Sequence, residues 1–119
     1  MSRPIRRGDV YWASIEKPGD DVAAITHPHV VVQDDVLNQS RITHVVVCAL
    51  TSNLHRATEP GNVLLEAGEA DLPARSVVVV SQISSIEKTR LGERIGALSR
   101  ERVDEILAGL AFQQASFDR

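Results

Sequence analysis

Short runs of β-branched apolar residues, separated by turn-forming residues, make up most of the chain. Residues 8–16 alternate between apolar and polar positions, and further apolar runs occupy residues 29–33, 42–50, 62–66 and 75–83. Runs of this length and valine content favour strands over helices. Proline and glycine divide the runs, as at Pro18-Gly19, Pro28, Pro60-Gly61 and Pro73. We therefore predict five or six short strands.

The end of the chain has a helical pattern instead. Beyond Ser99, apolar residues recur every three or four positions, at Val103, Ile106, Leu107, Leu110 and Ala111. Ser99 is a suitable N-cap, and Glu101 in the first turn suits the helix dipole. A set of short strands followed by one amphipathic helix predicts a mainly β fold, in which a strongly bent sheet or partly open barrel is capped by a C-terminal helix.

Length and composition restrict the class of protein. The chain has 119 residues, which suits one domain over residues 1–119, and its 43% hydrophobic and 24% charged residues are ordinary for a globular protein. It contains no apolar stretch of the roughly 18 residues that would span a membrane, and its N-terminus has no apolar signal segment. Cys48 is the only cysteine, so an intramolecular disulfide is impossible. We expect a reduced, cytoplasmic protein.

The charge is mildly negative overall but unevenly distributed. A formal net charge of -3 disfavours tight, charge-driven binding to long duplex DNA. Basic residues nevertheless cluster near the start and again late in the chain, and most are arginine, which suits bidentate phosphate contacts. These residues are Arg3, Arg6, Arg7, Lys88, Arg90, Arg94, Arg100 and Arg102. The clusters are either solvated surface or places where phosphates bind.

Two polar segments could carry chemistry. His27 and His29 lie on one face of a strand, where a His-x-His pair can chelate a metal with His44 or His55 as a third ligand. Pro28 between them, and the lack of a nearby glutamate, argue against this, so we expect no metal and no cofactor. Thr51-Ser52-Asn53 follows a buried strand and could cap the next loop or hold a phosphate or base edge. The loops at 17–26 and 52–59 are long for so short a chain, and long loops often carry function.

Several segments, taken in order, carry a family resemblance. They are Arg7-Gly8-Asp9-Val10-Tyr11-Trp12, His27-Pro28-His29-Val30-Val31-Val32-Gln33-Asp34-Asp35 with Asn38, the run from Val45 to Asn53, the run from Leu72 to Ile83, and Lys88-Thr89-Arg90-Leu91-Gly92. Together they resemble the MazF/PemK family of toxin endoribonucleases of bacterial toxin–antitoxin systems, over about residues 7–110. The resemblance implies an SH3-like small barrel of the CcdB/MazF/PemK type, with a strongly curved antiparallel sheet and a C-terminal helix, assembled as a homodimer.

The resemblance also implies an activity and its residues. Family members are mRNA interferases, which cleave single-stranded RNA at short sequences without metal, leave 2′,3′-cyclic phosphate and 5′-hydroxyl ends, and are blocked by an antitoxin protein. The family threonine that ends the third strand matches Thr51, but His27 stands where the family has arginine. Histidine is a weaker phosphate clamp than arginine and a better proton-transfer group at neutral pH. We therefore expect His27 to transfer a proton and Thr51 to bind a non-bridging phosphate oxygen.

Four further residues complete the predicted site. Arg7 is expected to supply positive charge, while Ser52, Asn53 and Gln82 match family positions near the RNA groove. The alternative is a catalytically weak or inactive homologue that acts as a protein-binding module, like the gyrase poison CcdB, which has a related fold. Thr51 together with Gln82 favours RNA as the substrate.

Overall fold

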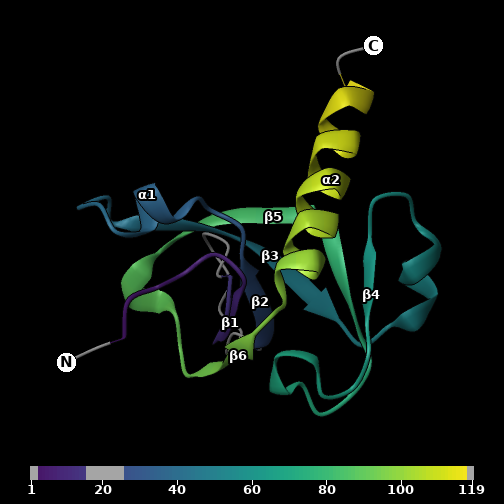
Figure 1. The fold of residues 1–119 in the computed structure, drawn as a ribbon, viewed down its shortest axis with the longest axis horizontal. Coiled ribbons are helices and arrows are strands. Elements are labelled where there is room, and N and C mark those ends of the chain that lie inside the picture. Colours follow the sequence, from purple (N-terminus) through teal and green to yellow (C-terminus); the bar gives the residue numbers. More distant parts are fainter. Residues whose placement is uncertain (1–2, 16–25, 118–119) are drawn as a thin grey trace, which may run out of the picture.

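The computed structural model describes residues 3–15 and 26–117. In chain order, its strands and helices are β1 (Asp9–Ala13), β2 (His27–Val31), α1 (Asp35–Asn38), β3 (His44–Thr51), β4 (Val63–Leu65), β5 (Ser76–Glu87), β6 (Arg94–Ala97) and α2 (Arg100–Phe117). Three short 3₁₀ helices lie in the connections, η1 (Leu54–Thr58), η2 (Glu69–Asp71) and η3 (Lys88–Arg90). In Figure 1, α2 stands between α1 and β4, with its N-terminal half against the sheet and its C-terminal half extending beyond it.

The six strands form one antiparallel sheet in the order β4-β5-β3-β2-β1-β6. The sheet is strongly curved because β5 contains an irregularity: its residues 79–82 stand opposite Ala49 alone, between the pairs Leu50–Val78 and Cys48–Ile83. Curling brings the two edges of the sheet towards each other, and η2, which follows β4, packs against β6. This confirms the predicted mainly β fold with a curved antiparallel sheet and a C-terminal helix.

Strand alternation gives the sheet two buried faces. One face carries Val10, Val30 and Cys48, and Ile106 of α2 packs on it. The opposite face carries Tyr11, Val31 and Val47, with Ile5 of the N-terminal segment and Leu91 packed against them. Within the described residues, no helix is long and apolar enough to cross a membrane.

The strand boundaries differ from the predicted ones at the start of β2, at the end of β5 and in β6. The sequence predicts that Pro28 ends a turn before a strand at 29–33, yet β2 begins at His27 and Pro28 is its second residue. The pairing of β2 with β3 begins only at His29, after the residue that has no N–H to donate. The predicted strand at 75–83 continues to Glu87, because its outer half remains paired with β3. That half is polar and largely exposed, so no apolar run marks it in the sequence. The edge strand β6 was not located in advance.

Candidate functional site

His27 and Thr51 lie near the same end of neighbouring strands. His27 is the exposed first residue of β2, and Thr51 is the half-buried last residue of β3. The strands are antiparallel, with His29 opposite Ala49 and Val30 opposite Cys48. The pairing of the two strands ends at His29 and Ala49, with His27 two residues beyond the one and Thr51 two residues beyond the other. His27 and Thr51, which are far apart in the sequence, thus lie at the same end of two adjacent strands.

The hydroxyl of Thr51 is oriented by the loop that follows it. Its Oγ1 accepts a hydrogen bond from the Asn53 backbone N–H at 3.2 Å. Because the oxygen is the acceptor in this bond, the hydroxyl hydrogen is left to donate to another group. Within the described residues, Thr51 makes no other side-chain hydrogen bond. A hydroxyl arranged in this way can bind an anionic oxygen.

The adjacent polar residues have different positions. The Asn53 side-chain Oδ1 accepts from the His55 backbone N–H at 3.2 Å and so caps η1. Its amide group is exposed, as is the side chain of Ser52. Both residues therefore lie beside Thr51 with polar groups at the surface, although the Asn53 carbonyl oxygen is already engaged in the loop.

Gln82 lies close to this end of the sheet. It is exposed and belongs to residues 79–82 of β5, which stand opposite Ala49, two positions from Thr51. Irregular strand segments of this kind redirect side chains beside functional sites. Gln82 itself precedes Ile83, whose partner on β3 is Cys48.

Arg7 lies elsewhere. Its Nε donates to the carbonyl oxygen of Val32 at 2.9 Å, and a second guanidinium nitrogen lies 3.8 Å from Asp34. Val32 follows the last residue of β2, so Arg7 contacts the opposite end of that strand from His27. At about 3.3 Å per residue, five residues separate the two ends by roughly 16 Å. The structure does not bring Arg7 together with His27 and Thr51.

Two other arginines lie near Thr51, one in the sequence and one just before the paired strand β5, and both already have acidic partners. Arg56 of η1 forms two hydrogen bonds to Glu59, at 2.8 and 3.0 Å. Arg75, which precedes the β5 residue opposite Thr51 by two positions, pairs with Glu66 at 3.0 Å. These acidic partners balance the two positive charges.

The histidines do not converge on a metal. His44 begins β3, at the opposite end from Thr51, and its Nδ1 lies 2.9 Å from the Thr43 hydroxyl. His29 is buried, and its Nδ1 lies 2.8 Å from the carbonyl oxygen of His27. Across the described parts of the chain, no group of three or more His, Cys, Asp or Glu residues could hold a metal ion. Cys48 is also buried, and burial raises the pKa of its thiol to about 12, so it is not a thiolate nucleophile.

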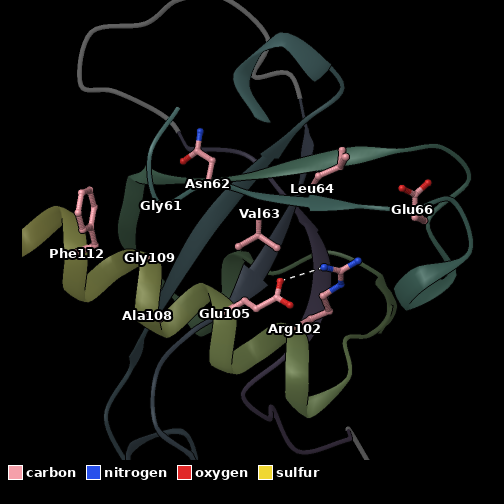
Figure 2. A pocket seen from close by; sticks show the side chains of 10 residues that line it. All are labelled: Gly61, Asn62, Val63, Leu64, Glu66, Arg102, Glu105, Ala108, Gly109 and Phe112. Atoms are coloured by element: carbon pink, nitrogen blue, oxygen red, sulfur yellow. Dashed lines mark hydrogen bonds and ion pairs between the residues drawn. The ribbon is translucent and has the colours of Figure 1, made fainter. Parts of the chain in front are cut away.

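A separate groove lies between α2 and the segment leading into β4. It has a volume of about 660 Å³ and is lined by residues such as Asn62, Val63 and Phe112. Figure 2 shows Arg102 and Glu105 of α2 pointing towards each other along it, at a distance of 3.0 Å. None of the predicted site residues lines this groove.

Of the two long loops in the predicted fold, the one at 17–26 cannot be placed in the site, since its residues 17–25 lie outside the described residues. The hydrogen bond from His29 to His27 was not foreseen. The sequence placed both rings on one face of a strand but could not show that one ring is buried and turned back along the strand.

Comparisons with known proteins show the family to which the chain belongs. Residues 6–113 match the family of PemK-like, MazF-like toxins of type II toxin–antitoxin systems. Endoribonuclease MazF2 of Mycobacterium bovis and endoribonuclease MazF6 of Mycobacterium tuberculosis are each 38% identical to the chain over 106 residues, covering 89% of this chain and 93% of theirs.

Solved structures show the same fold at lower identity. A mycobacterial endoribonuclease in complex with its cognate antitoxin has a TM-score of 0.74 at 23% identity, covering 93% of this chain and 95% of that chain. A MazE–MazF crystal structure from Deinococcus radiodurans has a TM-score of 0.76 at 16% identity, covering 96% of this chain and 98% of that chain. The similarity therefore extends over nearly the whole chain.

Proposed function

The chain belongs to the family of PemK-like, MazF-like toxins of type II toxin–antitoxin systems, and we propose that it is an endoribonuclease that cleaves single-stranded RNA at short sequences without a metal ion. Relatives named as endoribonucleases match it over 89% of its length, which supports this activity. The observation that carries the proposal is the antiparallel pairing of β2 with β3, which leaves exposed His27 and half-buried Thr51 at the same end of adjacent strands.

The reaction requires little more than a proton acceptor and a phosphate ligand. The ribose 2′-oxygen forms a bond to phosphorus, and the bond from phosphorus to the 5′-oxygen breaks. The 2′-hydroxyl proton passes to the neutral imidazole of His27, and the leaving 5′-oxygen takes a proton from solvent. The products are a 2′,3′-cyclic phosphate and a 5′-hydroxyl end. No metal is needed for this balance.

The remaining residues bind the RNA. The Thr51 hydroxyl donates to a non-bridging oxygen and stabilises the charge that develops there. Ser52, the Asn53 amide and Gln82 offer further hydrogen bonds to phosphates or base edges beside it. Arg7 has no place in the phosphate site of its own protomer, because its guanidinium is held at Val32 and Asp34.

The expected setting is a regulated toxin. We propose that the protein forms a homodimer, acts on cytoplasmic RNA and so inhibits translation and growth, and is held inactive by a cognate antitoxin. One solved structure of the same fold is a mycobacterial endoribonuclease in complex with its cognate antitoxin, and another contains MazE together with MazF, which supports an antitoxin partner here.

A cleavage assay tests the proposal. Purified protein is incubated with a long unstructured RNA in EDTA, and the product ends are mapped chemically. We expect cuts at one short sequence with cyclic-phosphate ends. His27→Ala should lower the rate by about a hundredfold or more, because a positioned general base contributes a factor of this size. Thr51→Val should lower it as well, while Thr51→Ser keeps the hydroxyl and most of the rate.

His44→Ala is the matched control, since His44 is an exposed histidine at the far end of β3. Its rate should equal that of the parent. Cleavage that appears only after a divalent metal is added would contradict metal independence. No cleavage by the parent, with growth inhibition retained, would overturn the proposal in favour of a protein-binding toxin. An unchanged rate in His27→Ala would leave the endoribonuclease but remove His27 from the proton transfer.

A further inference from the structure

His29 lies two residues after His27 on the same strand, but the two side chains differ in exposure and in hydrogen bonding. It is 3% exposed, whereas His27 is at the surface. Its Nδ1 lies 2.8 Å from the His27 carbonyl oxygen. A carbonyl oxygen can only accept a hydrogen bond, so Nδ1 must carry the hydrogen. In the neutral ring Nε2 is then unprotonated, and the hydrogen bond fixes this tautomer.

The groups around His29 favour an uncharged ring. Burial lowers the pKa of His29, the bond to the His27 carbonyl opposes that change, and positive charge on His27 lowers the pKa further. On β1, Tyr11 stands opposite His29; its hydroxyl lies 3.4 Å from Asp9, which pairs with Arg94 of β6 at 3.3 Å. On β3 the opposite residue is Ala49, which is uncharged. The charges of Asp9 and Arg94 therefore balance each other.

The main chain at His27 has few other restraints among the described residues. His27 pairs with Ala13 of β1, but the pairs that join β2 to β3 begin at His29. It also adjoins Pro28, which has no N–H to hold the strand. The ring of His29 supplies a side-chain hydrogen bond to this carbonyl from within the protein, where it is shielded from water.

We propose that His29 is a positioning residue for RNA cleavage: its neutral ring holds the His27 main chain through the Nδ1–H bond, so that the exposed His27 imidazole faces the phosphate bound at Thr51. This inference rests on the proposed endoribonuclease function. It assigns the two histidines separate tasks: His27 exchanges the proton, and His29 stays uncharged and fixes the position of its neighbour.

Replacements that separate volume from hydrogen bonding test the proposal. His29→Phe keeps a ring but has no donor, His29→Leu is a second apolar variant in case the first does not fold, and His29→Gln retains an N–H that can reach the His27 carbonyl. We expect the apolar variants to lose about tenfold to a hundredfold in kcat, the scale of effect that a small misplacement of a catalytic group has. KM should change less than about twofold, since the RNA contacts remain. His29→Gln should recover most of the parent rate.

A spectroscopic measurement does not depend on activity. Nitrogen chemical shifts of the imidazole rings in the free protein should show His29 neutral, with its hydrogen on Nδ1. A hydrogen on Nε2 would overturn the proposal, as would apolar variants that keep the rate and pH profile of the parent, or a His29→Gln variant no better than His29→Phe. If the parent cleaves no RNA, the proposed function fails and this inference fails with it. Parent cleavage with unaffected His29 variants overturns this inference alone.

Discussion

At the scale of single residues, the environment of a side chain decides its chemistry more than its type does. His27 and His29 are the same residue on the same strand face, yet only one is exposed to solvent. Burial lowers the pKa of the inner ring, which is hydrogen-bonded to the main chain, while the exposed ring is available to a substrate. Cys48 behaves similarly, since burial makes an otherwise reactive thiol inert.

The burial of His29 predicts a pH dependence of stability. The ordinary pKa of histidine is 6.5, and the pKa of His29 is lower in the folded protein. The unfolded chain therefore binds more protons below about pH 6.5, so the free energy of unfolding should fall as the pH drops from there towards the folded pKa. One proton accounts for at most about 1.4 kcal/mol per pH unit. Urea denaturation of the parent and His29→Gln, at a series of pH values, measures this difference.

His29→Gln should remove that part of the pH dependence, while His44→Gln, at an exposed position, serves as the control and should keep it. Parallel curves for the parent and His29→Gln would contradict the prediction. The measurement needs no RNA, so it examines the environment of His29 independently of the proposed activity.

The sequence located the strands that carry the proposed site, while the roles of its residues stay predictions. His27 and Thr51 were chosen from a family resemblance, and they lie at the same end of the adjacent strands β2 and β3. Asn53 was expected to cap its loop or to bind RNA, and its carbonyl oxygen does cap η1. Arg7 was expected to supply charge to the phosphate, but the pattern of a strand does not show which of its ends a neighbouring segment contacts. The bond from His29 to His27 depends on the burial and direction of one ring, which no spacing reveals.

At the scale of elements, α2 is attached to the sheet through a close contact of two glycines. A Cβ on Gly109 would collide with the backbone of Gly61, which itself has a φ of +88°. A side chain on Gly109 would therefore require the backbone to shift, and one on Gly61 would be tight against the Gly109 carbonyl oxygen and strained by the positive φ. Gly109 weakens helix propensity, but here it allows α2 to lie directly on the segment before β4.

Gly109→Ala therefore sets two effects against each other. Helix propensity alone would stabilise the protein by up to about 1 kcal/mol. The collision with Gly61 should outweigh this, because inserting atoms into a well-packed contact costs about 1–3 kcal/mol and occasionally more. We expect a net loss of stability, measured as the change in the free energy of unfolding by urea. Gln114→Ala, at an exposed position of the same helix, should change it by less than about 0.5 kcal/mol. A stabilised Gly109→Ala would contradict the packing argument.

Among the strands, prediction succeeded where apolar residues dominate and failed at polar ends. The first half of β5 is almost entirely buried, and β3 is buried or half-buried after His44, so their apolar composition marks both strands clearly. The outer half of β5 and all of β6 are held mainly by backbone pairing to a neighbouring strand. In β6, Gly96 lowers strand propensity, yet a Cβ there would collide with the backbone of Ala70 in η2. Such a requirement arises only from the tertiary fold.

At the scale of the whole molecule, one carboxylate joins the parts that close the curved sheet. Glu69 of η2 accepts two hydrogen bonds from Arg102 of α2, at 2.9 and 3.0 Å. It also accepts one from the backbone N–H of Glu66, just after β4, at 2.7 Å. Since η2 packs against β6, the helix and both edges of the sheet meet around this group.

The same contact predicts how the fold responds to acid. Hydrogen bonds from Arg102 lower the pKa of Glu69 below its ordinary value of 4.5. The stabilisation is therefore complete above about pH 4.5 and is lost as the pH falls through the lower folded pKa. Glu69→Gln should be less stable than the parent at neutral pH by about 1 kcal/mol, since both partners are partly exposed.

The difference between parent and Glu69→Gln should shrink as the solution is acidified, because the parent loses the charged interaction that the variant never had. Asp35, whose pKa the Arg7 backbone N–H lowers, adds to the acid sensitivity of both proteins alike and does not affect the difference. Glu93→Gln, at an exposed position, is the matched control and should follow the parent at every pH. A difference between parent and Glu69→Gln that stays constant down to about pH 3 would show that the closure of the sheet does not depend on the charge of Glu69.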